Sequence, residues 1–437
     1  MSNEKLASQN LAARPRATVV AVALGWLFSA VDIILLILFQ SEVAEALNVP
    51  AQSIKIAIGV GLLGSAVGGL GFSPLGDRFG RVRALGWAIV LYSIATAGMA
   101  FAPNIATLMA LRFVAGIGTG GEWSIGFALL AEVWPAKSRG KMGGLVAAMF
   151  NVGTFIAIAL YHSGLGWRMA FGVMIFPALG VAVLRRLVPE SPVWVEFARA
   201  REAGTLSERL RKAVKRPPVL SVFHVDTLAL TLKAILLFTL MNLGFYAFST
   251  IFIGYLQSAP DTGGLGLTKE QELPYHLALN ISGLVSVFLA GLLSDKLGRR
   301  ATYAGFCAMG AMGFGCLYFI LGNPFDPAQQ GSLIAVFSLC CMGFGINGVM
   351  GILIPELYPT HLRSTGPGVC QNLGKGVGGM VGPPVAGMLV LSMGYQFVLA
   401  MPGLIFLVLV ILIWTLPEAG GRTLRAVEDT DYLDESA

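Results

Sequence analysis

GDRFGRVR, at residues 76–83, and SDKLGRR, at residues 294–300, are two copies of one short charged segment in an otherwise apolar chain. Each copy lies in a break between two long hydrophobic stretches. A short acidic and basic segment at the same place in two halves of a hydrophobic chain is typical of a duplicated membrane transporter. The two segments therefore predict the architecture of the whole molecule.

Composition agrees with a chain that lies in lipid. Of its 437 residues, 55% are hydrophobic and 12% are charged, whereas roughly a quarter of the residues of a soluble domain are charged. Because about 20 apolar residues cross a bilayer, we expect an all-α membrane protein with twelve transmembrane helices. The predicted spans are 17–39, 53–75, 84–102, 105–131, 143–166, 168–188, 229–256, 275–294, 301–321, 331–355, 366–392 and 395–416. The first span is too long for a signal peptide and stays as the first helix.

The net charge of +6 is distributed as a topology signal. All but five of the 30 Lys and Arg lie in the tails or follow even-numbered spans, and the exceptions are Lys55, Arg112, Arg168, Lys269 and Lys375. By the positive-inside rule we expect a multi-pass protein of the inner (plasma) membrane with both termini in the cytoplasm, and no nucleic-acid partner. The five cysteines show no ligand-type spacing, so we expect no metal site, no cofactor and no disulfide framework.

Further repeats show that the duplication spans the chain. Residues Glu132, Trp134, Pro135 and Arg139 recur 224 positions later as Glu356, Tyr358, Pro359 and Arg363. Because each repeated pair joins helices of the same direction, we predict two parallel six-helix repeats around a central cavity. The predicted regions are an N-terminal tail 1–16, a first bundle 17–188, a basic cytoplasmic linker 189–228, a second bundle 229–416 and an acidic tail 417–437.

These motifs carry a family resemblance. GDRFGR at 76–81, RFVAGIGTGGEW at 112–123, PESP at 189–192 and the second-half copies resemble the major facilitator superfamily along essentially the whole chain. Within it, GGEW at 120–123, Asp32 and NLGKGVGGMVGPP at 372–384 resemble proton symporters of organic acids and metabolites, including aromatic-acid and sialic-acid carriers. The chain departs from the aromatic-acid carriers in having Ser29 and Asp32 where they show DGxD, and Lys375 where they carry Arg.

Three ionisable residues inside the predicted spans are candidates for proton coupling. A charge in the hydrocarbon costs ~2.5 to 3.5 kcal/mol on insertion scales, so one that is present lines a cavity or has a partner. Asp32 and Arg112 both lie about seven residues from the outer end of their helices, at the same depth. We interpret Asp32 as the group that takes up and releases a proton, with Arg112 modulating it; the alternative is a permanent ion pair between two helices. Glu122 is a second candidate for protonation, or a structural pair.

Lys375 is the candidate for binding a substrate carboxylate. It lies among glycines, which allow a ligand to approach closely, and its ammonium is a compact charge suited to one carboxylate. Alternatively, it neutralises Glu122 as a gating pair. Other polar residues that we expect to orient a small ligand, each alternatively an interhelical hydrogen bond, are Gln371, Asn372, Asn151, Asn242, Tyr246, Asn280 and Asn347.

Matched acidic and basic residues lie on the predicted cytoplasmic side. The resemblance implies that they join the two halves when the cavity opens outward and separate when it opens inward. This predicted cytoplasmic gate consists of Asp77, Arg78, Arg81, Glu132, Arg139, Glu190, Asp295, Arg299, Arg300, Glu356 and Arg363.

The sequence favours proton-coupled uptake of a small organic anion by alternating access, by a monomer whose partners are a carboxylate substrate, protons and membrane lipids. The alternatives are a sugar or polyol proton symporter and a drug/proton antiporter of the same fold. Helix five lacks the proline of the antiporters' glycine motif. An enzyme is not expected, because the chain has no nucleophile constellation, metal ligands or large soluble domain.

Overall fold

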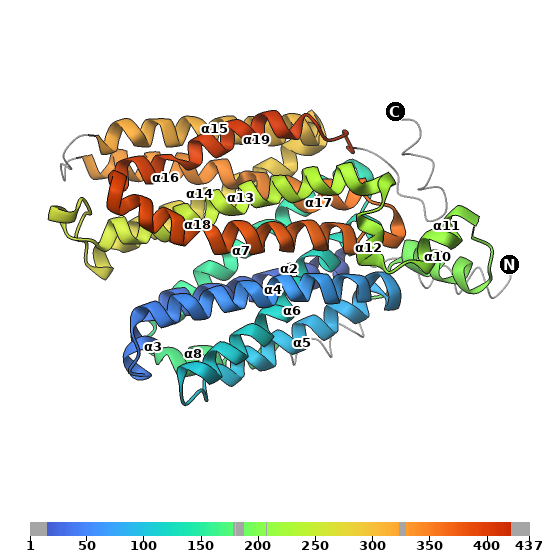
Figure 1. Ribbon diagram of the computed structural model, residues 1–437, viewed down its shortest axis with the longest axis horizontal. Helices are drawn as coiled ribbons and strands as arrows, with labels where there is room; N and C mark the ends of the chain where they lie inside the picture. Colours follow the sequence, from blue (N-terminus) through green and yellow to red (C-terminus); the bar gives the residue numbers. More distant parts are fainter. Residues whose placement is uncertain (1–14, 178–179, 181–187, 207, 323–328, 421–437) are drawn as a thin grey trace.

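The computed structural model describes residues 15–177, 180, 188–206, 208–322 and 329–420. Two groups of long helices run roughly along the longest axis of the molecule, with the first half of the chain below the second half in Figure 1. Among these residues, nine helices are long and apolar enough to cross a membrane, or ten if a bent pair at residues 360–400 is one span. The sixth predicted span, 168–188, lies partly outside the described residues.

The first half begins each long helix close to the predicted position. Its helices are α2 (Pro15–Leu38), α3 (Gln40–Ala46), α4 (Ala51–Phe79), α5 (Arg81–Met99), α6 (Ile105–Val133), α7 (Arg139–His162) and α8 (Gly166–Gly172). Asn104 caps α6, because its side-chain oxygen accepts a hydrogen bond from the Thr107 backbone N–H at 2.9 Å. Such a cap satisfies one of the free donors at a helix start.

The second half repeats this arrangement. Its helices are α13 (Val225–Gln257), α14 (Lys269–Leu297), α15 (Arg299–Leu321), α16 (Gln330–Gly343), α17 (Asn347–Leu357), α18 (Thr365–Ala400) and α19 (Pro402–Ile413). A short 3-10 turn at Phe344–Ile346 joins α16 and α17, which together form the predicted span 331–355. Inside α18 the backbone leaves helical geometry at Gly394, between the eleventh and twelfth predicted spans.

Three short helices connect the halves: α10 (Pro192–Glu202), α11 (Glu208–Lys215) and α12 (Pro218–Val222). They gather at one end of the bundle, which we call the linker end (Figure 1). The Trp194 indole N–H donates to the carbonyl of Asp77 in α4 at 2.8 Å, and the Phe197 ring stacks on His361 of the second half at 6.5 Å between centroids. The helix α10 therefore contacts both halves.

The most extensive contacts between the halves are those of two equivalent helix pairs, α4 with α18 and α7 with α14. At the second pair, a methyl group built on Gly144 would lie only 2.7 Å from the Cα atom of Gly291. Small residues at this crossing let the two backbones approach closely. Because α4 corresponds to α14 and α7 to α18 in the duplication, the second contact repeats the first.

The two repeated charged segments also have the same backbone shape. The residue after α4 is Gly80 with φ 111°, and the residue after α14 is Gly298 with φ 89°. These positive φ values favour glycine over any residue with a Cβ. Each glycine breaks one long helix and starts the next, which holds the acidic and basic residues of the segment at the linker end.

Candidate functional site

Asp32 and Arg112 form a buried ion pair between α2 and α6. Nη1 of Arg112 lies 3.0 Å from each carboxylate oxygen of Asp32, and Nη2 lies 3.1 Å from the Asp32 carbonyl oxygen. The Thr96 hydroxyl of α5 donates to the same carboxylate. Asp32 is 2% exposed and Arg112 is 5% exposed. The equal depth predicted from the sequence is thus accompanied by direct contact, and Thr96 is a third member that the sequence analysis did not identify.

Glu122 of α6 is buried deep in the first half. Both carboxylate oxygens are buried with no hydrogen-bond partner in the described part of the chain. The carboxylate lies against Gly25 of α2, where an added methyl group would be 2.6 Å from Oε1. The Ser29 hydroxyl lies close to this carboxylate but not in the geometry of a hydrogen bond. Buried polar groups are normally hydrogen-bonded, so this carboxylate is unusual.

Lys375 of α18 faces the first half across the boundary between the repeats. Its Nζ donates to the Ser65 hydroxyl of α4 at 3.4 Å, and Ser65 donates to the Asn372 amide oxygen at 3.1 Å. Within the described residues no carboxylate forms an ion pair with Lys375, although its charge interacts at longer range with those of Asp32 and Glu122. The ion pair between Lys375 and Glu122, the alternative role predicted for Lys375, is not formed in this structure.

The predicted polar residues divide into two groups by their contacts. The amide of Asn372 is buried and donates to the carbonyls of Gly120 and Gly368, both at 2.8 Å. The amide groups of three others donate to backbone carbonyls: Asn242 to Phe238, Asn347 to Phe344, and Asn280 to Asn151. By contrast, the Gln371 amide oxygen is buried without a partner among the described residues, one helical turn from Lys375 in α18. The Tyr246 ring of α13 faces Gly379, which also lies in α18.

At the linker end, a first charge cluster consists of Asp77, Arg81, Glu132 and Arg363. Arg81 lies 2.7 Å from Asp77 and 3.0 Å from Glu132. Arg363 of the second half reaches Glu132 at 3.4 Å. Asp77 also accepts hydrogen bonds from the backbone N–H groups of Ser364 and Thr365, at 3.1 and 2.8 Å. A carboxylate of the first half therefore caps α18 of the second half.

A second charge cluster repeats the first with the halves exchanged. It consists of Asp295, Arg299, Glu356 and Arg139. Arg299 lies 2.8 Å from Asp295 and 3.3 Å from Glu356, and Arg139 of the first half lies 2.8 Å from Glu356. Asp295 caps α7 by accepting from the backbone N–H groups of Gly140 and Lys141, at 2.8 and 2.7 Å.

In the described part of the chain, the contacts of the remaining predicted gate residues Glu190, Arg78 and Arg300 lie within their own half. Glu190 caps α5 of its own half through the N–H groups of Arg81 and Val82, as Glu418 caps α15 through those of Arg299 and Arg300. Burial raises the pKa of Glu190 against the opposing hydrogen bonds. Burial also acts to raise the pKa of Glu418, but its backbone hydrogen bonds outweigh that effect and lower it. The Arg300 guanidinium lies over Trp414, and that of Arg78 over Phe79.

Comparison with known proteins identifies relatives along the whole chain. The model of the Major Facilitator Superfamily matches residues 21–373 and 281–430. The niacin transporter NiaP of Acinetobacter baylyi is 31% identical over 431 residues, which cover 93% of this chain and 94% of that protein. The cis,cis-muconate transport protein of the same organism is 28% identical and covers 86% and 88% of the two chains. Among solved structures, the proton:xylose symporter XylE of E. coli is similar with a TM-score of 0.76 at 19% identity, over 95% of this chain and 98% of that one.

Proposed function

Because the chain belongs to the major facilitator superfamily, a family of transporters rather than enzymes, we propose that it imports a small organic anion together with protons by alternating access. Two relatives are named for niacin and cis,cis-muconate transport, which supports a carboxylate-bearing cargo. The proposal assigns the substrate to the boundary between the halves, near Lys375.

The observation that carries this proposal is that the Lys375 ammonium has no anionic partner among the described residues. Its ammonium is half-buried and has a 3.4 Å hydrogen bond to Ser65 but no ion pair within the described residues. A partly buried cation without a counter-ion is costly inside a membrane protein. A substrate carboxylate would supply the missing charge. The Gln371 amide oxygen, which is buried without a partner among the described residues, would accept a hydrogen bond from an N–H or O–H group of the substrate.

Two carboxylates supply the proposed proton sites. When Asp32 takes up a proton, it loses its charge and holds Arg112 less firmly, which frees a cation inside the first half. Glu122 has no hydrogen bond in the described part of the chain, so a proton on this carboxylate would remove an unpaired buried charge. We assign the coupling of transport to protons to these two acids, Asp32 and Glu122.

The two charge clusters supply the proposed gate. They join the halves at the linker end, which we assign to the cytoplasm, with both chain termini on that side of the inner membrane. The inward-open state then requires the Asp77 and Asp295 caps to separate from α18 and α7. The proposed rigid units are the bundles 17–188 and 229–416, connected by the linker 189–228.

The test is ligand-induced thermal stabilisation of the purified protein, measured for the wild type and for Lys375→Ala. We expect niacin, cis,cis-muconate or another simple carboxylate to raise the melting temperature of the wild type, because a ligand that binds the folded state stabilises it. This shift should disappear in Lys375→Ala and persist in Lys233→Ala, whose lysine donates to a backbone carbonyl elsewhere. Stabilisation by uncharged sugars alone would overturn the organic-anion assignment.

A further inference from the structure

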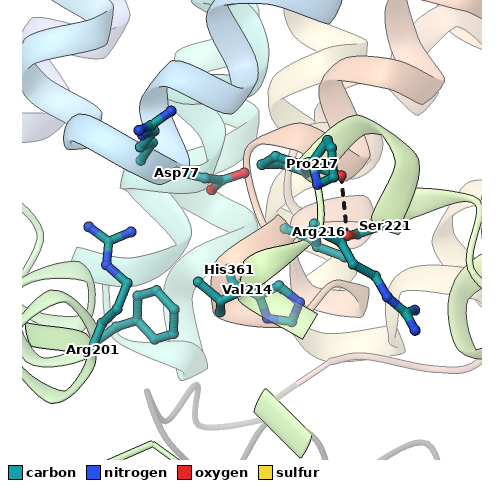
Figure 2. A pocket seen from close by; sticks show the side chains of 11 residues that line it. Asp77, Arg201, Val214, Arg216, Pro217, Ser221 and His361 are labelled. Atoms are coloured by element: carbon teal, nitrogen blue, oxygen red, sulfur yellow. Dashed lines mark hydrogen bonds between the residues drawn. The ribbon is translucent and has the colours of Figure 1, made fainter. Parts of the chain in front are cut away.

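A cavity of about 610 Å³ lies at the linker end, away from Lys375 and Asp32. Its walls come from α4 of the first half, from the linker helices, and from the short turn η5 (Thr360–Leu362) of the second half. Figure 2 shows Arg201 and Arg216 on opposite sides of this pocket, with His361 between them. The volume lies within the range of small-molecule sites in proteins.

The charge of the pocket is positive. Arg78, Arg201 and Arg216 line it, and within the described residues none of these three arginines forms an ion pair with an acid. The one acidic lining residue, Asp77, is 5% exposed, pairs with Arg81, and accepts the N–H groups that begin α18. Its charge is therefore already balanced. The site offers three guanidinium groups and no available carboxylate in this part of the structure.

The chemistry of these groups indicates the ligand. Guanidinium groups are planar forks of donors that match phosphate oxygens, often in bidentate pairs. Phe197 and Val214 add an apolar wall on the linker side. We propose that this pocket binds a small phosphate-bearing anion, either a free phosphorylated metabolite or a phospholipid headgroup, and that the bound anion holds the linker end closed.

The closing effect follows from which elements build the walls. Arg78 belongs to the first half, His361 to the second, and Arg201 to α10, which already contacts both halves through Trp194 and Phe197. Separation of the halves at this end would divide the pocket. A ligand that binds only the undivided pocket shifts the equilibrium toward the closed state. The effect on transport depends on the proposed alternating access, whereas the binding does not.

The binding test uses the purified full-length protein and thermal stabilisation by inorganic phosphate, glycerol 3-phosphate and ATP, at an ionic strength matched with chloride. We expect at least one of these probes to stabilise the wild type. Arg201→Gln should weaken the apparent affinity about tenfold, since it removes a charge-assisted hydrogen bond. Arg216→Gln should weaken it less, because that side chain is more exposed. Arg199→Gln removes an exposed arginine that lies on α10 outside the pocket lining, and it should leave the affinity unchanged.

A second arm separates the two sources of phosphate. If only nanodiscs of phosphatidylglycerol, and not those of phosphatidylcholine, stabilise the wild type more than Arg201→Gln, the ligand is a lipid headgroup. If the soluble phosphates do so in detergent, the ligand is a free metabolite. If neither distinguishes the wild type from Arg201→Gln, or if Arg199→Gln weakens binding as much, diffuse surface charge explains the data and the site is overturned.

The closing effect is tested in proteoliposomes that transport a carboxylate. The effective anion, supplied on the linker side, should slow uptake by the wild type and leave uptake by Arg201→Gln unchanged. Binding without this inhibition would overturn the closure. If no carboxylate is transported at all, the proposed function fails, while the thermal measurements still decide whether the pocket binds an anion.

Discussion

The charge clusters at the linker end and the ionisable residues of the interior differ in how completely they are partnered. In the clusters each carboxylate has a cationic partner, and Asp77 and Asp295 also accept two backbone N–H groups each from the opposite half. Among the interior acids Asp32 and Glu122, Asp32 alone forms an ion pair within the described residues, with Arg112. Among the described residues, Glu122 has no hydrogen bond, and Lys375 has one.

The same contrast appears in the duplication. The clusters occur twice, with the halves exchanged, as expected of contacts that both repeats need in order to close one end of the molecule. The interior residues occur once, and the position matching Lys375 at the 224-residue offset is Asn151. We therefore relate the repeated charge clusters to closure of the linker end. The unrepeated and incompletely partnered interior residues are the ones available to protons and substrate.

We expect the largest effect from replacing Asp32, because this residue belongs to a buried ion pair and is also the proposed site of proton uptake and release. Asp32→Asn cannot release a proton, so it should abolish accumulation driven by a pH gradient and retain substrate exchange. For one coupled proton, a gradient of one pH unit sustains about tenfold accumulation, since it equals about 1.4 kcal/mol. Uptake into proteoliposomes, with and without the gradient, measures this. Glu45→Gln, which changes an exposed acid of α3, should accumulate normally, and full accumulation by Asp32→Asn would remove the coupling role.

Variants of two glutamates of α6 test the contrast directly, because Glu132 belongs to the first charge cluster and Glu122 to the interior. Glu132→Gln leaves the buried guanidinium groups of Arg81 and Arg363 short of an anion, which should lower the free energy of unfolding by about 3–5 kcal/mol. Glu122→Gln removes no hydrogen bond seen in the described structure, so it should change stability by less than about 1 kcal/mol while altering the pH dependence of uptake. Denaturation and uptake measurements separate the two. Equal destabilisation would show that Glu122 is a structural residue.

Much of the linker end could be predicted from the sequence, because charged residues there stand out against an apolar chain. The repeated segments predicted that Asp77, Arg81, Asp295 and Arg299 belong to one charged set, and the structure shows the ion pairs within it. The expected family and twelve-helix fold are confirmed by the comparisons. The contact between Asp32 and Arg112 needed one further step. Their equal depth followed from the rise per residue of a helix.

The interior beyond that pair could not be predicted in the same way. These helices are apolar on nearly all sides, so periodicity does not indicate which face of a helix meets another helix and which meets lipid. Thr96 and Ser65 look like ordinary small polar residues of a span, yet they contact Asp32 and Lys375. Conversely, Asn242 and Asn347 stand out as polar, but their amides bond to carbonyls one turn earlier in the chain.

Asp77 and Asp295 each cap a helix of the opposite half, and we expect a smaller, local effect when either cap is removed. Asp77→Asn should speed hydrogen exchange at the N–H groups of Ser364 and Thr365, and Asp295→Asn should do so at Gly140 and Lys141. Each loss of a cap is worth about 1 kcal/mol, hence about fivefold in exchange. Hydrogen-exchange mass spectrometry of both variants measures this. If exchange rises only within the mutated half, the caps do not join the halves.

The smallest expected effect distinguishes the two repeats from each other. Glu418 has a lowered pKa in the folded protein, so its contribution to stability is present above the unfolded value, about 4.3, and is lost as the pH falls through the folded pKa. Glu190 has a raised pKa, so its contribution is fully present below the unfolded pKa and is lost as the pH rises through the folded pKa. The two equivalent caps should thus respond to acid in opposite directions.

The measurement is the melting temperature of the wild type relative to Glu418→Gln and Glu190→Gln, between pH 7 and pH 4. On acidification, the wild type should lose its advantage over Glu418→Gln and gain relative to Glu190→Gln, each by roughly 1–2 °C. The glutamines keep an oxygen that accepts a hydrogen bond, so the difference isolates the charge. Parallel responses would mean that the two caps have equivalent surroundings, because the deeper burial of Glu190 is the physical reason for their difference.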